Sequence, residues 1–263
     1  MIINVHAHIR ATDDVGAKLE HYDHPDLVRT CLCGDNAKVK EAFTKYPDKV
    51  IGLGMLRGEA CHPRLVDQYH AEGFKGLKMI ALPEAYDSPT YYPIYEKAER
   101  YKMPILFHTG HLGIRETQKR GITSHIKMRP GCFDAIARAF PELFIIGAHL
   151  GNPWYEEACG VAFKHKNVYF DLCGGTVRLL PYSRFKHLFM TSKEKNLRSL
   201  DEVLDERLVS KFVFGTDGPP VAELLEFCEN LFNAFDFNQE IREKILWRNA
   251  AMMLGMEKEL ETK

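Results

Sequence analysis

The sequence predicts one domain over residues 1–263 with the fold of an α/β protein, a somewhat irregular (β/α)8 or TIM barrel. Three observations support this fold class. Eight short apolar segments alternate with stretches of helical periodicity, which is typical of repeated βα units around a parallel sheet. The length of 263 residues suits one such barrel, which usually takes about 250 residues. No shift in composition marks a linker between domains.

The apolar segments are short enough to be strands. Eight strands with helices between them favour a closed barrel over an open sheet. The expected strands are residues 3–6, 27–33, 50–56, 74–79, 104–108, 143–149, 167–173 and 211–217.

Helical periodicity is clearest over residues 39–46, 133–140 and 221–228, where apolar side chains recur at i, i+3, i+4 and i+7. Pro219 and Pro220 suit the first turn of the third of these helices. A final helix over residues 239–254 is expected to stop at Gly255. The remaining long stretches, 9–26, 109–128 and 174–210, are predicted to be loops, and loops that follow strands are where a barrel builds its active site.

Composition narrows the range of functions. The formal net charge is −1, so nothing favours binding to nucleic acid or to a membrane surface. The N-terminal sequence lacks the pattern of a signal peptide, and no apolar run reaches the length of a membrane span. Seven cysteines without zinc-finger spacing favour reduced thiols in a cytoplasmic protein. The expected partner is a small-molecule substrate, and self-association into a homo-oligomer is left open.

Polar residues that can bind metal follow several of the expected strands. His6 and His8 end the first strand, and residues two apart on a strand point to the same face. His108, His149 and Asp217 end the fifth, sixth and eighth strands. Because the carboxyl ends of barrel strands gather at one rim, these side chains are expected to converge. Imidazole and carboxylate ligands fit Zn²⁺, with Mn²⁺ and Fe²⁺ as alternatives.

These motifs carry a resemblance to a known family. The sequence reads HAH at 6–8, HTG at 108–110, AHLG at 148–151 and GTDGP at 215–219. In this order they resemble the amidohydrolase superfamily, and most closely its branch of small metal-dependent hydrolases and related decarboxylases. The C-terminal WRNAAMMLG at 247–255 is similar to the ending of that branch.

The resemblance implies roles for individual residues. His6, His8, His108 and Asp217 match the metal-binding positions, which implies a divalent cation as cofactor. His149 matches a residue that acts on the substrate or, in some members, binds a second metal. Asp217 is also implied as the general base that takes a proton from water, whose pKa a metal lowers to about 7.

Lys78 has an ambiguous role. If Leu77 and Met79 face the helices, Lys78 faces the barrel interior. The resemblance implies either a carboxylated lysine that bridges two ions or a bare lysine that holds a substrate carboxylate. One ion is favoured over two, because a bare lysine must react with CO₂ before it can be a ligand. The remaining alternative is a structural lysine paired with Asp171, which is itself expected to be structural.

Other candidates have ordinary alternatives as well. Arg57 lies at a strand end, where its guanidinium could bind a substrate carboxylate, but a surface arginine is the ordinary reading. His111 is expected either to line the pocket or to be a solvated loop residue. Asp217 could merely cap the helix that follows it, and His149 could be a core histidine. The cysteines are expected to be core residues.

Three functions remain open from the sequence. The leading one is hydrolysis of a small, carboxylate-bearing amide, ester or lactone by metal-activated water. The second is metal-dependent, non-oxidative decarboxylation of an unsaturated or aromatic carboxylic acid. Both would use the same ligands. The third is a barrel that binds metal or ligand without catalysis.

Overall fold

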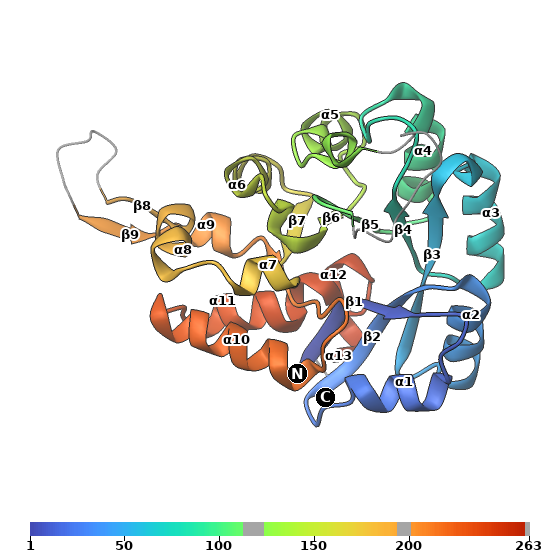
Figure 1. Ribbon diagram of the computed structural model, residues 1–263, viewed down its shortest axis with the longest axis horizontal. Coiled ribbons are helices and arrows are strands. Elements are labelled where there is room, and N and C mark those ends of the chain that lie inside the picture. Colours follow the sequence, from blue (N-terminus) through green and yellow to red (C-terminus); the bar gives the residue numbers. More distant parts are fainter. Residues whose placement is uncertain (113–123, 194–200, 261–263) are drawn as a thin grey trace.

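Eight parallel strands form a nearly closed barrel in the computed structural model, which describes residues 1–112, 124–193 and 201–260 (Figure 1). The strands follow one another in chain order around the sheet. They are β1 (Ile2–Ile9), β2 (Leu27–Gly34), β3 (Val50–Arg57), β4 (Gly76–Ile80), β5 (Ile105–Phe107), β6 (Ile145–Gly147), β7 (Val168–Asp171) and β10 (Phe212–Val213). All eight expected strands are therefore confirmed, and the fold is the TIM barrel that the sequence predicts.

The barrel closes between β1 and the segment that follows β10. This segment keeps an extended course beyond Val213 and forms an isolated parallel bridge between Asp217 and Ala7. The amide of Val5 donates to the carbonyl of Phe214 at 2.9 Å, and the amide of Asp217 donates to the carbonyl of His6 at 2.7 Å. The last strand of the barrel thus lies directly beside the first.

Buried polar side chains reinforce this closure. Asn4 and Thr216 are both fully buried. The amide nitrogen Nδ2 of Asn4 donates to Oγ1 of Thr216 at 3.0 Å, and Oδ1 of Asn4 accepts from the backbone amides of Thr216 and His6 at 3.1 and 3.2 Å. The Asn4 amide group therefore ties the first strand to the last.

Helices cover the outside of the barrel between successive strands. The expected helices at 39–46, 133–140 and 221–228 are present as α2 (Asn36–Lys45), α5 (Cys132–Ala139) and the start of α10 (Val221–Ala234). Pro220 precedes α10 rather than lying in its first turn, because the helix begins at Val221. The other outer helices are α3 (Pro63–Glu72), α4 (Tyr92–Arg100) and α6 (Tyr155–Lys164). Across the described residues, no helix has the length and apolarity to cross a bilayer.

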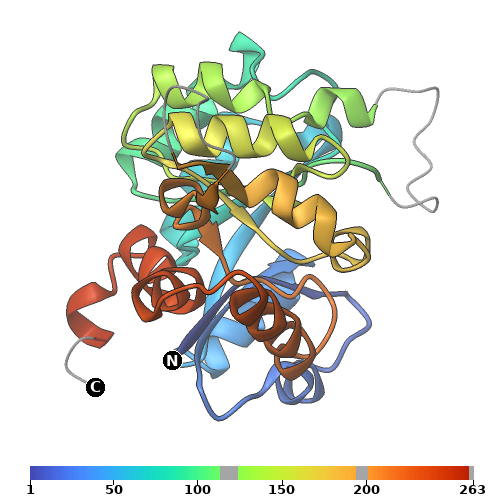
Figure 2. The ribbon, with the colours of Figure 1, turned by 90° about the vertical axis from the view of Figure 1, so that its left-hand side faces the viewer.

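The C-terminal helix is broken into pieces. It runs as α11 (Gln239–Glu243), a π-helical turn at Lys244–Arg248 and α12 (Asn249–Met253). It ends near Gly255, as expected, and this residue has a left-handed φ of 66°. A last short helix, α13 (Glu257–Leu260), follows. Both views place the N-terminus and the last described helix, α13, towards the same end of the molecule (Figures 1 and 2).

The stretches predicted to be loops contain regular structure, and the one over 109–128 includes a short 3-10 helix at His125–Met128. Residues 9–26 include α1 (Val15–Tyr22), which Asp14 caps through the amide of Ala17. Residues 174–210 include α7 (Gly175–Arg178), α8 (Tyr182–Phe189), α9 (Glu206–Val209) and an antiparallel pair of strands, β8 (Met190–Ser192) and β9 (Glu202–Leu204). This strand pair extends away from the barrel (Figure 1). Part of the third predicted loop, 113–123, lies outside the described residues.

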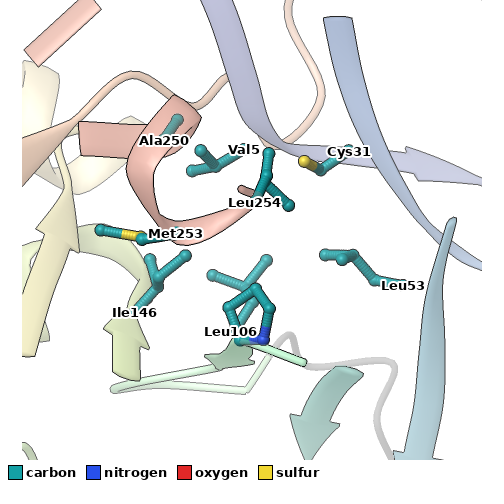
Figure 3. A pocket seen from close by; sticks show the side chains of 9 residues that line it. Val5, Cys31, Leu53, Leu106, Ile146, Ala250, Met253 and Leu254 are labelled. Atoms are coloured by element: carbon teal, nitrogen blue, oxygen red, sulfur yellow. The ribbon is translucent and has the colours of Figure 1, made fainter. Parts of the chain in front are cut away.

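The barrel has an apolar interior that is separate from the core under the outer helices. Side chains that point inward, among them Val5, Cys31, Leu53 and Leu106, meet residues of α12 at the end opposite the strand carboxyl termini (Figure 3). Leu77 and Met79 belong instead to the outer core, as expected from their alternation with Lys78. Apolar side chains fill this end of the barrel interior. The polar side chains of the candidate site therefore lie at the other end, at the carboxyl-terminal rim.

The closure of the barrel can be tested with the Asn4–Thr216 pair. Replacing Asn4 with leucine removes the acceptor of the buried His6 amide, whereas the amide and the hydroxyl of Thr216 keep their bonds to the carbonyl of His6, so we expect a loss of about 1–3 kcal/mol of unfolding free energy. Urea unfolding of the full chain measures this loss. Asn4→Leu combined with Thr216→Val should cost less than the sum of the single changes, because both remove the same bond. Asn230→Leu, at an exposed position on α10, is the control. Strict additivity would show that the pair does not stabilise the closure.

Candidate metal centre

Three side chains from opposite ends of the chain converge at the rim. The Nε2 atoms of His6 and His8 are 3.0 Å apart, and Oδ1 of Asp217 lies 3.5 Å from the first and 3.1 Å from the second. Ligand atoms about 2.1 Å from one ion lie about 3.0–3.4 Å apart in octahedral or tetrahedral geometry. The triangle therefore has the dimensions of one face of a metal site. Three of the four residues expected to bind metal are brought together here.

His6 is oriented by Asp171 at the end of β7. Its Nδ1 lies 2.8 Å from Oδ2 of Asp171, and both side chains are fully buried. Burial lowers the pKa of His6 to about 3, with a further contribution from the charge of Lys78, so the imidazole is neutral at neutral pH. A carboxylate that accepts the Nδ1 proton leaves Nε2 with a free lone pair for a metal. The sequence predicts a structural role for Asp171, and the structure places its carboxylate in contact with His6 of the site.

Lys78 does not pair with Asp171, which corrects that alternative. Its ammonium lies on β4, is 1% exposed, and is 3.1 Å from Nε2 of His6. Asp171 instead uses its other oxygen, Oδ1, to accept from the amides of His149 and Cys173 at 2.7 and 3.2 Å. Because Lys78 donates to the nitrogen that a metal needs, metal binding must displace this contact.

His108 and His149 lie next to each other beside the triangle. Their ring centroids are 5.2 Å apart, and the ring of His149 is 5.4 Å from that of His6. Burial lowers the pKa of both imidazoles, so both are neutral. Nε2 of His108 is 3.1 Å from the carbonyl of His111, so the role of His108 as a ligand stays a prediction.

Two cysteines that the sequence predicts to be core residues also contact the site. Sγ of Cys173 lies 3.5 Å from Nδ1 of His6 and 3.4 Å from Nδ1 of His149. Sγ of Cys33 lies 3.3 Å from Nδ1 of His8. Both thiols are fully buried, as core residues would be, so composition gave no hint of these contacts. Their position near the carboxyl ends of β2 and β7 is the signal from which these contacts could have been predicted.

The backbone is in the left-handed region at two site residues. His149 has φ 58° and Asp217 has φ 64°, a conformation that is uncommon for residues other than glycine. The helix that follows Asp217 has Pro220 at its cap position and no side-chain cap bond. Asp217 is therefore not a helix cap, which removes the ordinary alternative for this residue.

An open cleft of about 630 Å³ adjoins the triangle. His8 and Asp217 form part of its wall, together with the cationic residues Arg10, Lys18 and Arg57. Arg57 is thus placed where it can meet a molecule bound at the triangle. His111 does not line this cleft: its carbonyl contacts His108, and its ring lies 4.8 Å from that of His125 and 6.5 Å from that of Trp154.

The fold and this cluster define the class of protein. It is a TIM barrel whose carboxyl-terminal rim carries a histidine–carboxylate cluster of the kind that holds a divalent metal. The family model of the amidohydrolases matches residues 6–256, and the chain belongs to that family. The family is metal-dependent, and its enzymes include both hydrolases and carboxy-lyases.

Solved structures share the fold at low sequence identity. An uncharacterized TIM-barrel protein from Bordetella bronchiseptica is 22% identical, covering 88% of this chain and 79% of its own, with a TM-score of 0.64. A dihydroxybenzoic acid decarboxylase from Polaromonas sp. JS666, with bound manganese and the inhibitor 2-nitroresorcinol, is 15% identical over 97% of both chains, with a TM-score of 0.62. A probable 2-pyrone-4,6-dicarboxylic acid hydrolase from Acinetobacter baumannii, with citric acid bound, is 15% identical over 97% of this chain and 99% of its own, with a TM-score of 0.61. At these identities the likeness supports the fold alone.

The orienting role of Asp171 can be tested with Asp171→Asn. In one orientation the new side-chain NH₂ faces Nδ1 of His6 and donates to it, so the ring proton must move to Nε2. In the flipped orientation the NH₂ faces the backbone N–H groups of His149 and Cys173, which are donors too. Either arrangement disfavours metal binding, so we expect affinity for Zn²⁺ to fall by about 10–100-fold. Competition with a chromophoric chelator measures this affinity.

The control for that experiment is Asp26→Asn, whose carboxylate is 62% exposed and lies before β2, at the other end of the barrel. Circular dichroism should show that both variants keep the fold. Equal affinity of Asp171→Asn and the parent chain would mean that His6 does not bind metal through Nε2.

Proposed function

We propose that this protein is a metal-dependent hydrolase that acts on a small, carboxylate-bearing amide, ester or lactone. One observation carries the proposal. The Asp217 carboxylate, whose side chain is 38% exposed, stands at the wall of the cleft with Oδ1 beside two imidazole nitrogens. A group that can both contact a cation and accept a proton from water is thereby open to an incoming substrate.

The donor set fits a divalent metal. His6, His8 and Asp217 would hold the ion, with His108 as the proposed fourth ligand. Two imidazoles and a carboxylate suit Zn²⁺, and Mn²⁺ or Fe²⁺ would accept the same donors. We favour a single ion, because Lys78 is a bare lysine. When bound, the ion supplies Lewis acidity that lowers the pKa of water to about 7.

Asp217 is suited to the role of general base. Burial alone would raise its pKa, but the hydrogen bond from His8 holds the pKa of Asp217 well below its usual range. The group is therefore a carboxylate at neutral pH. Both ion-pair contacts of its side chain run through Oδ1, and Oδ2 is the oxygen that we assign to the proton of the attacking water.

His149 and the cations of the cleft would hold the substrate. The neutral imidazole of His149 can exchange a hydrogen bond with a polar group of the substrate near the reacting bond. Asp13 and Asp35 also line the cleft, but their carboxylates accept backbone amides of Arg10 and Lys38. These two carboxylates and Asp217 match Arg10, Lys18 and Arg57 in number, so the proposal of an anionic substrate rests on the ability of a guanidinium to bind a carboxylate through two parallel hydrogen bonds and not on a net positive charge of the cleft.

Decarboxylation of an unsaturated or aromatic acid would use the same residues, so the assay must separate the two reactions. Protein loaded with Zn²⁺ or Mn²⁺ is given carboxylate-bearing lactones, esters, amides and aromatic acids, while acid release and CO₂ release are followed in parallel. Hydrolysis without CO₂ supports the proposal. CO₂ release alone would replace it with a carboxy-lyase, and metal binding without turnover would favour a non-catalytic barrel.

The role of Asp217 predicts the effect of Asp217→Asn. Loss of the base should reduce kcat for hydrolysis by about 10²–10⁴-fold, the range for a positioned acid–base group. Asp26→Asn, far from the rim, should leave kcat unchanged. Steady-state kinetics on metal-loaded protein of known metal content measures both. A decrease in Asp217→Asn that matches only its loss of metal would remove the assignment as base.

The role of Arg57 predicts a change in substrate preference. A charge-assisted hydrogen bond contributes about 1.5–3 kcal/mol, so Arg57→Met should raise KM for a carboxylate substrate by roughly 10–100-fold. KM for the neutral amide analogue of the same substrate should change little. Arg100→Met, on the exposed end of α4, is the control. If KM rises equally for the charged and the neutral substrate, Arg57 does not bind the carboxylate.

A further inference from the structure

The last strand of the barrel ends too early to pair with His8. The carbonyl of His6 faces the segment after β10, where it accepts from the amide of Asp217 at 2.7 Å. Backbone groups alternate in direction along a strand, so the N–H and C=O of His8 face the same side. The chain turns away at Asp217, where φ is 64°, and the amide of Gly218 bonds back to the carbonyl of Thr216 at 2.8 Å. The backbone groups of His8 therefore need another partner.

The hydroxyl of Tyr22 takes the place of the missing strand. Tyr22 is the last residue of α1 and is fully buried. Its hydroxyl accepts from the amide of His8 and donates to the carbonyl of His8, both at 3.2 Å, and the carbonyl of Asp217 is a second acceptor at 3.5 Å. Burial raises the pKa of Tyr22 to about 12, so the hydroxyl keeps its proton at neutral pH. One hydroxyl thus contacts the backbone of two residues of the candidate site.

We propose that α1 positions the metal centre, with Tyr22 as the positioning residue that fixes the spacing of His8 and Asp217. The inference rests on the proposed metal centre. Nε2 of His8 and Oδ1 of Asp217 are 3.1 Å apart, and a shift of either backbone would change this distance. Tyr22 binds the backbone and not the ligand atoms, so it holds both residues without competing with the ion.

A second contact ties the same helix to the same segment. Nε2 of His21 donates to the carbonyl of Gly218, the residue after Asp217, at 2.9 Å. The ring of His21 lies edge-on to that of Tyr22, with centroids 5.1 Å apart. His21 is exposed, whereas Tyr22 is buried. The helix therefore holds the Asp217 segment through one buried and one exposed side chain.

The helix α1 is itself well fixed and forms part of the cleft. Asp14 caps its start through the amide of Ala17. Lys18 lines the cleft, and its ammonium lies 5.0 Å from the centre of the Tyr22 ring, where a cation is attracted to the aromatic face. One short helix thus joins the wall of the cleft to the residues proposed to hold the metal.

Tyr69 on α3 is a matched comparison. It is also buried, and its hydroxyl likewise accepts one hydrogen bond and donates another to a strand. It accepts from Nδ2 of Asn36 at 2.8 Å and donates to the carbonyl of Met55 on β3 at 2.9 Å. Neither partner is a proposed metal ligand. Tyr69→Phe therefore removes a buried hydroxyl of the same kind without touching the candidate site.

The test compares Tyr22→Phe, Tyr69→Phe and the parent chain. Urea unfolding of the metal-free proteins should show a loss of stability in both variants, because each leaves buried polar groups without a partner. Affinity for Zn²⁺ is measured by chelator competition, and the visible spectrum of the Co²⁺-loaded protein reports the ligand geometry. We expect Tyr22→Phe to bind Zn²⁺ about 5–100-fold more weakly, with an altered Co²⁺ spectrum, because the freed backbone relaxes and must be brought back when the ion binds. Tyr69→Phe should agree with the parent chain within about twofold.

The outcomes distinguish this inference from the proposed function. If Tyr22→Phe loses stability but keeps the Zn²⁺ affinity and the Co²⁺ spectrum of the parent chain, Tyr22 is only structural, and the metal centre stands. An equal loss of affinity in Tyr69→Phe would also overturn the positioning role. If the parent chain binds neither ion, both proposals are wrong.

Should Tyr22→Phe fail to fold, His21→Gln and His21→Leu replace it, because His21 is exposed and only glutamine keeps a donor. His21→Leu should then bind Zn²⁺ roughly 2–10-fold more weakly than His21→Gln, the range for one hydrogen bond. Equal affinities would reject α1 as the element that positions the centre.

Discussion

The backbone pairing between β1 and the segment after β10 is the constraint on which the site depends. The carbonyl of His6 accepts from the amides of Thr216 and Asp217 at 3.0 and 2.7 Å, and the side chain of Asn4 joins the same two segments. These bonds unite positions more than 200 residues apart in the chain. Asp217 reaches the HAH motif only because the barrel closes there. The geometry of the candidate metal site is therefore a property of the closed fold, and whatever loosens the closure must also loosen the site.

The buried charges near the carboxyl-terminal rim are a second constraint, because the groups that carry them are shielded from solvent. Lys78, Asp171 and His6 are all at most 1% exposed, and their contacts meet at the imidazole of His6. A buried charge is tolerated only when it is paired and hydrogen-bonded. Asp171 meets this condition with four bonds to His6, His149 and Cys173, and its pKa stays low. The ammonium of Lys78 has Nε2 of His6 as its contact, and a metal at that nitrogen would exclude it. One cation at this point, ammonium or metal, balances the surrounding carboxylates.

Much of this arrangement could be predicted from the sequence, because it follows from strand alternation and from the common rim of a parallel barrel. The eight strands, the inward direction of Lys78 and the convergence of His6, His8 and Asp217 are of this kind. The partners within the rim could not be predicted, since a hydrogen bond of Asp171 or Cys33 depends on strand register and on side-chain rotamers. Short elements such as α1 and the β8–β9 pair were missed because they span too few residues to show a period. His108 is the site residue whose contact with a metal still rests on the sequence motif.

Left-handed backbone at His149 and Asp217 shows how the fold holds the site. Such a conformation costs about 1–3 kcal/mol at a residue other than glycine, so something must offset it. It is not diagnostic by itself, because Ala81, Lys102 and Asp236 also have positive φ. His149 and Asp217 are distinguished by the groups that their backbone amides bind. The amide of His149 donates to the carboxylate of Asp171 at 2.7 Å, and that of Asp217 donates to the carbonyl of His6 at 2.7 Å. A bond to a charged acceptor contributes about 1.5–3 kcal/mol, which is enough to offset the strain at His149. One amide thus donates to His6 and the other to the carboxylate that orients His6. The strained backbone and the cluster of His6, His8 and Asp217 therefore stabilise each other.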